Sequence, residues 1–428
     1  MKSRNIAAAG IAAFTTAALL LTGCSGGGGN SGDNGDKAAA TTGTLDFYTD
    51  KAAWEPDFDE LNATSKDAVD ISLNTTGYSD AAQYDAFIKQ SFRTQKSPGL
   101  FTWHTGDSLK QLVDENLVAE TTDLWSKAID EGWATEDLRD EYTFDGKQYC
   151  VPMNIAYWVM YYNKNIFQEQ GIDVPTTWKE LDAAAAKLKD AGVTPYYQTS
   201  ILFTFQWFQQ LVAGTDPELY KGLSTGEVKY TDPEIVDIMN IWLDEQKKGW
   251  FSDAGSTTDP AVGLKQGDFA MINFGSFFNG SLDGAGMVSG EDYGMFVIPA
   301  VNADLDTTPV AVESGPLCVA ENSKQKDLGL AYSEWWMSPD AQTAWNAARG
   351  DVAFNPKATV KDPMLAELGK TVADDKHTLF TRYFEATPTP ILTVALEQFG
   401  AFNANPGDPM PFLEAIQAEA DKYWAEQK

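Results

Sequence analysis

Strand-like and helix-like segments alternate along most of the chain, and this alternation constrains the fold more than any other feature of the sequence. Residues 177–180 have a capping-box pattern, which begins an amphipathic helix that ends at Gly192. Ser338-Pro339 begins a second helix, which ends at Gly350. Short apolar or alternating segments are typical of strands at residues 45–48, 69–73, 270–274 and 294–299. Strands interleaved with long helices predict an α/β fold built in layers.

The N-terminal residues have the pattern of an export signal. Two basic residues precede an apolar run over residues 6–21, which is shorter than the roughly 20 residues that suit a membrane-spanning helix. Residues 21–24, Leu-Thr-Gly-Cys, resemble the bacterial lipobox, in which the cysteine thiol receives a diacylglycerol and becomes the mature N-terminus. We therefore expect residues 1–23 to be a lipoprotein signal peptide and Cys24 to be lipidated. The alternative is an ordinary secretory peptide with an incidental cysteine.

A polar stretch follows the expected signal. Residues 24–42 consist mainly of Gly, Ser, Asn, Asp and Ala, and such a segment buries too little apolar surface to fold, so it predicts a flexible tether. The folded part then begins near Gly43. About 385 residues remain, which is more than one hydrophobic core usually organises, so two lobes are expected.

The chain is strongly acidic. Removal of residues 1–23 takes away Lys2 and Arg4 and changes the net charge from −31 to −33. This charge argues against a nucleic-acid partner and against adhesion to anionic lipid, since both need basic patches. Membrane contact is therefore expected only through the lipid anchor, and an anionic ligand is less favoured.

Motifs for catalysis and cofactor binding are mostly absent. Two histidines, His104 and His377, are too few for a His-rich metal site. Residues 222–226 match the G-x-S-x-G pattern of hydrolases, but their polar flanks predict a loop instead of the strand, turn and helix that the nucleophile requires. The sequence thus predicts no cofactor, no metal and no enzyme. A secreted glycoside hydrolase stays the rival class, because a carboxylate pair among 62 acidic residues would leave no motif.

Aromatic residues are abundant, with 13 Trp, 16 Tyr and 23 Phe, and several stand in polar, loop-like surroundings. Flat aromatic side chains cover the apolar faces of sugar rings, and neighbouring polar side chains can satisfy the hydroxyls. For any single aromatic residue, packing in the core is the alternative. Together they favour a carbohydrate ligand.

Five segments, in chain order, resemble extracellular solute-binding proteins of the family 1, carbohydrate ABC-transporter type, which are maltose-binding-protein-like. They are GKQYCVP at residues 146–152, YYNKNIF at 161–167, VPTTWKEL at 174–181, GDFAMINFGSF at 267–277 and WWMSPDAQ at 335–342. Each match alone is weak. The resemblance is strong because the matches follow one another in the family's order, from about residue 44 to the end of the chain.

The resemblance implies a two-lobed α/β fold of the periplasmic-binding-protein type II, with a ligand cleft between the lobes. It places strands that cross between the lobes near residues 151–154, 313–316 and 351–356. One lobe would contain residues 43–151 and 316–352, and the other residues 153–314 and 354–428. After lipidation of Cys24, Cys150 and Cys318 would lie on neighbouring crossing segments, where they either form a disulfide or stay as buried thiols.

The resemblance also implies the function: an exported, lipid-anchored receptor, expected to be a monomer, that captures an oligosaccharide and delivers it to the permease of an ABC importer. A peptide- or polyamine-binding protein on the same scaffold is a further alternative. From loop placement and family order we expect aromatic platforms at Trp54, Trp103, Tyr157, Trp158, Trp207 and Phe277. We expect hydroxyl contacts from His104, Asp107, Asn154, Glu313, Asn355 and Arg382.

Overall fold

The computed structural model describes residues 41–94, 97–201 and 203–427. The expected signal peptide, the lipidation site Cys24 and the tether up to residue 40 lie outside the described residues. None of the helices in the described part of the chain is both long enough and apolar enough to cross a membrane.

The described residues form ten strands. These are β1 (Gly43–Thr49), β2 (Ile71–Gly77), β3 (Leu100–Thr102), β4 (Thr143–Phe144), β5 (Lys147–Gln148), β6 (Val151–Asn163), β7 (Met271–Gly275), β8 (Tyr293–Phe296), β9 (Thr308–Cys318) and β10 (His377–Thr381). Eight of them make one sheet, in which the order is β2-β1-β3-β9-β6-β7, β10 pairs with β9 and β8 pairs with β6. β4 and β5 form a separate hairpin.

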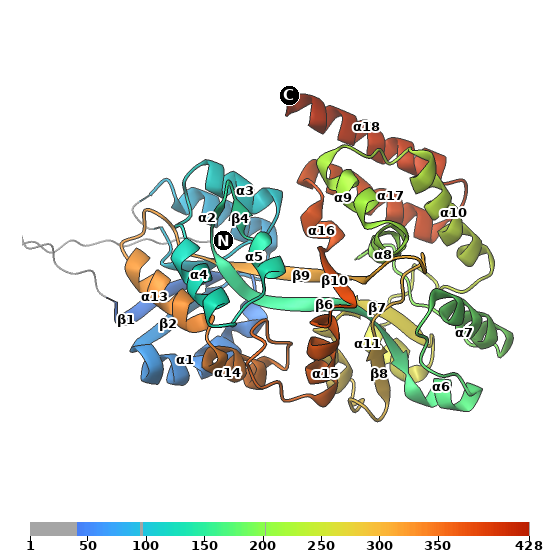
Figure 1. Ribbon diagram of the computed structural model, residues 1–428, viewed down its shortest axis with the longest axis horizontal. Helices are drawn as coiled ribbons and strands as arrows, with labels where there is room; N and C mark the ends of the chain where they lie inside the picture. The colour runs from blue at the N-terminus through green and yellow to red at the C-terminus, as the bar shows by residue number, and fades with distance from the viewer. Residues whose placement is uncertain (1–40, 95–96, 202, 428) are drawn as a thin grey trace, which may run out of the picture. The chain divides into compact units, whose positions relative to one another are not determined.

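Helices connect these strands (Figure 1). The longer ones are α1 (Glu55–Val69), α2 (Ala81–Ser91), α3 (Asp107–Asp114), α4 (Thr122–Asp130), α7 (Trp178–Asp190), α8 (Gln206–Thr215), α9 (Pro217–Thr225), α10 (Pro233–Lys247), α13 (Lys326–Trp336), α14 (Pro339–Arg349), α15 (Pro363–Val372), α17 (Thr389–Ala404) and α18 (Met410–Glu426). The shorter ones are α5 (Glu136–Asp140), α6 (Lys164–Gln170), α11 (Pro260–Gln266), α12 (Phe278–Gly284), α16 (Tyr383–Ala386) and the 3-10 turn η1 (Ala52–Trp54).

Local sequence signals explain several of these boundaries. The Thr177 hydroxyl accepts a hydrogen bond from the Glu180 amide, and the Glu180 carboxylate accepts one from the Thr177 amide, so the predicted capping box begins α7. The predicted helix over residues 339–349 is also confirmed, with Ser338 as its N-cap and Gly350 in a left-handed conformation at its end. The predicted loop at residues 222–226 was wrong, because Pro217 begins helix α9, which runs to Thr225.

β6 and β9 are the longest strands and lie side by side, antiparallel (Figure 1). Every residue of β6 except Tyr162 is buried. The apolar sequence of this strand allows burial on both faces, which is typical of a central strand. A β-bulge interrupts the pairing between Pro152 and Asn154, and beyond it Ala156 pairs with Glu313. Two of the segments that the family resemblance assigns to the crossing are therefore hydrogen-bonded neighbours.

Two hydrophobic clusters organise the chain. One contains Leu45, Phe47 and Ile71 of the parallel strands together with Trp336 and Trp345 of α13 and α14, and it continues along β6 to residues near β7 and β8. The other is built around helices α8, α10 and α17, with Phe208, Trp242 and Phe399 in contact. Two cores agree with a chain too long for one.

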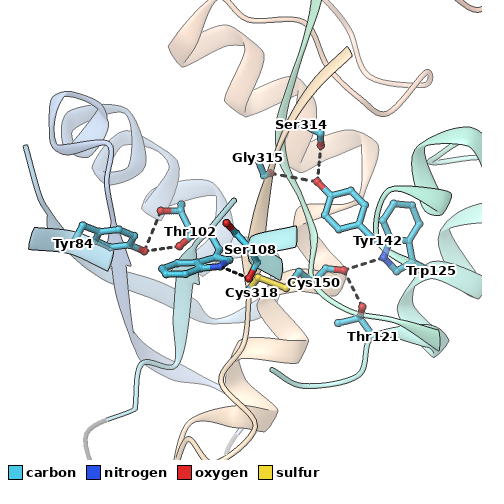
Figure 2. The surroundings of a disulfide bond; sticks show 11 residues. Tyr84, Thr102, Ser108, Thr121, Trp125, Tyr142, Cys150, Ser314, Gly315 and Cys318 are labelled. Atoms are coloured by element: carbon cyan, nitrogen blue, oxygen red, sulfur yellow. Dashed lines mark hydrogen bonds between the residues drawn. A yellow bond between two sulfur atoms is a disulfide. The ribbon is translucent and has the colours of Figure 1, made fainter. Parts of the chain in front are cut away.

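Cys150 and Cys318 form a disulfide, which joins the residue before β6 to the last residue of β9, and their Cα atoms lie 4.3 Å apart (Figure 2). Both cysteines are buried. The Cys150 carbonyl accepts hydrogen bonds from the Thr121 hydroxyl at 2.8 Å and the Trp125 indole at 2.9 Å. The start of β6 is thus fixed to β9 by a covalent bond, and to α4 and its N-cap residue Thr121 by one hydrogen bond each.

Candidate functional site

Polar side chains follow parallel strands at the point where each strand ends. β1 pairs in parallel with both β2 and β3, so their carboxyl ends meet at one edge of the sheet. Asp50 and Lys51 follow β1 and form an ion pair at 2.6 Å, and Asp50 accepts a hydrogen bond from Thr102 at 2.8 Å. Burial alone would raise the pKa of Asp50, but the attraction of Lys51 and the hydrogen bonds from Lys51 and Thr102 together outweigh it, so the pKa is lowered. His104, just after β3, lies 3.3 Å from Asp85.

Arg382 is the centre of a second group of charges. It directly follows β10, and its side chain is only 6% exposed. Its Nη1 lies 2.6 Å from Glu313 of β9, and Nε and Nη2 donate to the two carboxylate oxygens of Glu385 at 2.8 and 2.5 Å. This two-pronged contact with Glu385 is the geometry in which guanidinium binds carboxylate most firmly. Both carboxylates are therefore held by one cation.

Aromatic rings surround this guanidinium. Its central carbon lies 5.3–5.8 Å from the ring centroids of Phe384, Trp158 and Phe203. The Trp158 indole nitrogen also donates to Glu313, at 3.3 Å. Phe277 completes the group, with its ring centroid 6.3 Å from that of Trp158. We call these residues the Arg382 cluster: Trp158, Phe203, Phe277, Glu313, Arg382, Phe384 and Glu385.

The electrostatics of the cluster follow from its burial. Desolvation raises the pKa of Glu313 although Arg382 opposes this shift. Desolvation alone would lower the pKa of Arg382, but its attraction to Glu313 and Glu385 raises it. A third carboxyl, Glu141, accepts a hydrogen bond from Thr381, and burial raises its pKa to about 7. Acidic groups thus outnumber basic ones around Arg382.

The loop after β3 packs against the segment that contains Glu385. Gly106 has a φ of 65° and approaches the Glu385 carbonyl so closely that a Cβ at this position would collide with it. Nearby, Asp107 accepts a hydrogen bond from the Tyr423 hydroxyl at 3.4 Å, and the Thr105 hydroxyl donates to the Ser314 carbonyl at 3.3 Å. The loop that the family resemblance selected therefore lies beside the Arg382 cluster.

The structure brings some of the predicted site residues together. Trp158, Phe277, Glu313 and Arg382 are in the Arg382 cluster. His104 is in the adjacent loop, and Asp107 is the first residue of α3, directly after that loop.

Other predicted residues are elsewhere. The Trp54 ring packs against Trp345 and under the Arg349 guanidinium, 4.4 Å from the ring centroid. Trp103 is 5% exposed, and its indole donates to the Ser108 carbonyl. The loop-like setting expected for Trp207 was wrong, because this residue is in the first turn of α8 and is buried in the second hydrophobic cluster.

Three further candidates, Asn355, Tyr157 and Asn154, make contacts outside the Arg382 cluster. The Asn355 amide donates to the Met337 carbonyl at 2.7 Å, and its oxygen accepts from the Lys357 amide. Tyr157 was expected in a loop but is in strand β6, beside Trp158. Side chains alternate along a strand, so Tyr157 and Trp158 point to opposite faces of the sheet. Asn154 is buried against Gly315 of β9.

Sequence reasoning missed five residues of this region. Asp50 and Lys51 could have been found, since ligand sites of open α/β sheets lie outside the carboxyl ends of strands. No local sequence pattern marks Glu385 and Phe384 as site residues, apart from their nearness to Arg382 in the sequence. Phe203 is held at a φ of 58°, which is uncommon for a bulky residue and which no sequence pattern indicates.

The cluster combines aromatic faces with carboxylate acceptors, an arrangement that can hold a polar ligand with apolar faces. No group of three or more His, Cys, Asp or Glu within residues 41–94, 97–201 and 203–427 is arranged to hold a metal ion.

Comparison with known proteins supports this interpretation. A family model described as bacterial extracellular solute-binding protein matches residues 46–343. Over 226 residues the chain is 30% identical to an uncharacterized ABC transporter extracellular-binding protein of Pyrococcus horikoshii. Over 224 residues it is 25% identical to an sn-glycerol-3-phosphate-binding periplasmic protein of Rhizobium meliloti. Each match covers 49% of this chain and 49% or 50% of the relative, so the chain spans about half the length of the curated relatives it matches.

Solved structures share the fold over nearly the whole chain. A chitin oligosaccharide binding protein superposes with a TM-score of 0.74 at 19% identity, covering 90% of this chain and 99% of that chain. The bacterial solute receptor AcbH, described as preferring β-D-galactopyranose, gives 0.74 at 20% identity, with 89% and 98% covered. These likenesses confirm the two-lobed type II α/β fold that the family resemblance implies.

Proposed function

Because the chain belongs to the bacterial extracellular solute-binding protein family, we propose that it is the substrate-binding lipoprotein of an ABC importer. In this proposal it captures an oligosaccharide between two lobes and delivers it to a membrane permease, without chemical change to the sugar. The lobes are those expected from the sequence, residues 43–151 with 316–352 and residues 153–314 with 354–428.

The observation that supports a sugar is the Arg382 cluster. Phe384 is 37% exposed, and Phe203 and Phe277 are half-buried, so each can offer part of a ring to a ligand. The Glu313 side chain is 23% exposed, and its Oε2 already receives Arg382 and Trp158. Its second oxygen is the acceptor that we assign to a sugar hydroxyl. Aromatic faces beside such an acceptor match the two surfaces of a pyranose ring.

The charges of the site favour a neutral ligand over a phosphate ester. One relative binds sn-glycerol 3-phosphate according to its name, and a phosphate requires cations that are not already neutralised. Here two carboxylates bind Arg382, and Asp50 binds Lys51. A phosphate would have to compete with carboxylates already in contact with both cations.

The proposed mechanism is closure around the ligand. A sugar held by the loop at His104–Asp107 and by the Arg382 cluster bridges two parts of the chain that the sequence assigns to different lobes. It binds the closed form better and therefore shifts the population toward it. The contacts of Gly106 with Glu385 and of Asp107 with Tyr423 are the kind that closure would form.

The expected location follows from the family and the N-terminal sequence. We propose that residues 1–23 are removed during export, that Cys24 carries the lipid, and that the mature monomer stays outside the membrane near its permease. Incorporation of a radiolabelled palmitate into the full chain, and its loss in Cys24→Ser, would test the anchor.

Binding can be tested by calorimetry with malto-, xylo- and chito-oligosaccharides, sn-glycerol 3-phosphate, a tripeptide and spermidine. We expect one oligosaccharide class to bind with one site per chain and to be recovered unchanged by chromatography. Phe384→Ala should weaken this binding by about tenfold or more, since loss of an aromatic contact face costs on the order of 1.5 kcal/mol. The matched control is Phe144→Ala, a half-buried phenylalanine in the β4–β5 hairpin, which should leave affinity unchanged.

Each other outcome selects a different function. Saturable binding of the phosphate ester alone would contradict the neutral-ligand argument. Binding of spermidine or the peptide alone would assign the scaffold to those ligands. Shortened sugars after long incubation would indicate a glycoside hydrolase, and Glu313→Gln would then be expected to abolish turnover.

A further inference from the structure

A cavity of about 460 Å³ lies on the other face of the strands that carry the Arg382 cluster. Ile155 and Tyr157 of β6 and Val312 of β9 line it. The next residues along the two strands, Trp158 and Glu313, point into the cluster. Because successive side chains of a strand point to opposite faces, the same two strands separate the cavity from the cluster. The cavity is thus distinct from the site described above.

The cavity has an apolar floor and walls. They are formed by the two strands, α15 and the segment before it, with contributions from Ile155, Val312, Val352, Phe354, Leu365 and Leu379. Its volume is within the range of roughly 300–1,000 Å³ in which proteins bind small molecules. Filling it with an apolar group would remove from water the side chains that line it, at a gain of about 25 cal/mol per Å².

A polar group within the cavity has hydrogen-bonding capacity to spare. The Nδ1 atom of His377 is buried, and none of the described residues bonds to it. The Tyr157 side chain lies on the floor of the cavity. Buried polar groups normally have partners, so the His377 Nδ1 atom has an acceptor position to spare.

The mouth of the cavity is acidic. Three aspartates among the lining residues, Asp137, Asp374 and Asp375, are exposed to solvent, and the lining contains a single lysine, Lys370. From this combination we propose that the cavity is a second binding site, which takes a small amphipathic amine. The alkyl or aryl body lies against the apolar floor, and the ammonium group lies at the mouth, near the three carboxylates.

Two glycines provide a matched pair of variants. Gly369 on α15 lines the cavity, and a Cβ added there meets nothing within 4 Å. A Cβ added at Gly284, at the end of α12, also meets nothing within that distance, and Gly284 does not line the cavity. Gly369→Trp therefore fills the cavity, whereas Gly284→Trp adds the same side chain elsewhere. Ala366→Phe, one turn earlier on α15 and also on the lining, is the second filling variant should Gly369→Trp not fold.

The probes are octylamine, octan-1-ol and octanoate, titrated calorimetrically below the concentrations at which they aggregate. We expect octylamine to bind the full chain with one site, and octanoate to bind at least about tenfold more weakly. Gly369→Trp should weaken octylamine by about tenfold or more, and Gly284→Trp should leave it within about twofold. The double variant Asp374→Asn/Asp375→Asn should weaken octylamine but not octanol.

Three results would overturn the proposal. Octylamine affinity that is equal in wild type, Gly369→Trp and Ala366→Phe would mean that the amine binds elsewhere on this acidic protein. Octanoate binding as tightly as octylamine would remove the charge argument. Non-saturating uptake of the amine would indicate general surface association. None of these results bears on oligosaccharide binding at the Arg382 cluster, which Phe384→Ala tests separately.

Discussion

Glu245 on α10 is a carboxyl buried in the second hydrophobic cluster, 2.5 Å from the Trp207 indole nitrogen that donates to it. Burial raises its pKa from 4.5 to about 8. In the unfolded chain the group titrates near 4.5, whereas in the folded protein it keeps its proton to about pH 8. Its contribution to stability is therefore fully present below pH 4.5 and is lost as the pH rises through about 8.

Replacement of Glu245 by Gln should remove this pH dependence, because an amide stays neutral. Relative to wild type, the variant should gain on the order of 4 kcal/mol in free energy of unfolding between pH 5 and pH 8. Urea unfolding followed by circular dichroism at several pH values measures the difference. Glu397→Gln, an exposed position on α17, is the control and should follow wild type. A constant offset between Glu245→Gln and wild type at all pH values would contradict the prediction.

Trp207 also shows the limit of reading single residues from sequence. Its polar neighbours suggested exposure, but those neighbours, Gln206, Gln209 and Gln210, are themselves buried in the structure. These glutamines are thus buried amides of a helix and not residues of an exposed loop. Their burial follows from the packing of α8 against other helices, which the local sequence does not show. Glu313 and Arg382 were predicted separately, through family order, and their ion pair was not. That pair depends on the pairing of β10 with β9, two strands that lie far apart in the sequence.

At the level of elements, the start of α7 depends on its capping box. Thr177→Ala removes the hydroxyl that accepts from the Glu180 amide at 3.2 Å, so we expect a loss of about 1 kcal/mol in the free energy of unfolding. Denaturant titration measures the loss. Thr393→Ala, in the exposed interior of α17 where the hydroxyl bonds only to a carbonyl of the same helix, should change stability by less than about 0.5 kcal/mol. Equal effects of the two substitutions would show that the capping box adds nothing.

Helix boundaries such as these were predictable because the signals lie within a few residues of each other. The residues near 45, 71 and 271 were also correctly predicted as strands, from their apolar or alternating patterns. The partners of those strands were not predictable from the pattern. β6 and β9 are more than 140 residues apart in the chain, and it was the resemblance to a family, not periodicity, that placed them together.

For the whole molecule, the disulfide should be the largest single contribution to stability. It closes a loop with a sequence separation of 168, and closing a loop of this length restricts the unfolded chain by about 5 kcal/mol. We expect Cys150→Ala/Cys318→Ala to lose up to that amount in the free energy of unfolding. In a Cys24→Ser background, a thiol reagent should detect no free thiol in the unreduced, unfolded protein. Two reactive thiols per chain would contradict the disulfide.

The same bond also limits how far the chain can be stretched. The proposed lipid anchor at Cys24 would expose the protein to mechanical load through its N-terminus, and a disulfide cannot be extended by any force that merely unfolds protein. When the protein is stretched, the segment between Cys150 and Cys318, with a sequence separation of 168, would not extend until the bond is reduced. An optical trap pulling on the two ends should therefore record roughly 590 Å of additional length when a reductant is added. Force applied through the proposed anchor would then reach the segments outside the disulfide, while the chain between the two cysteines stays looped.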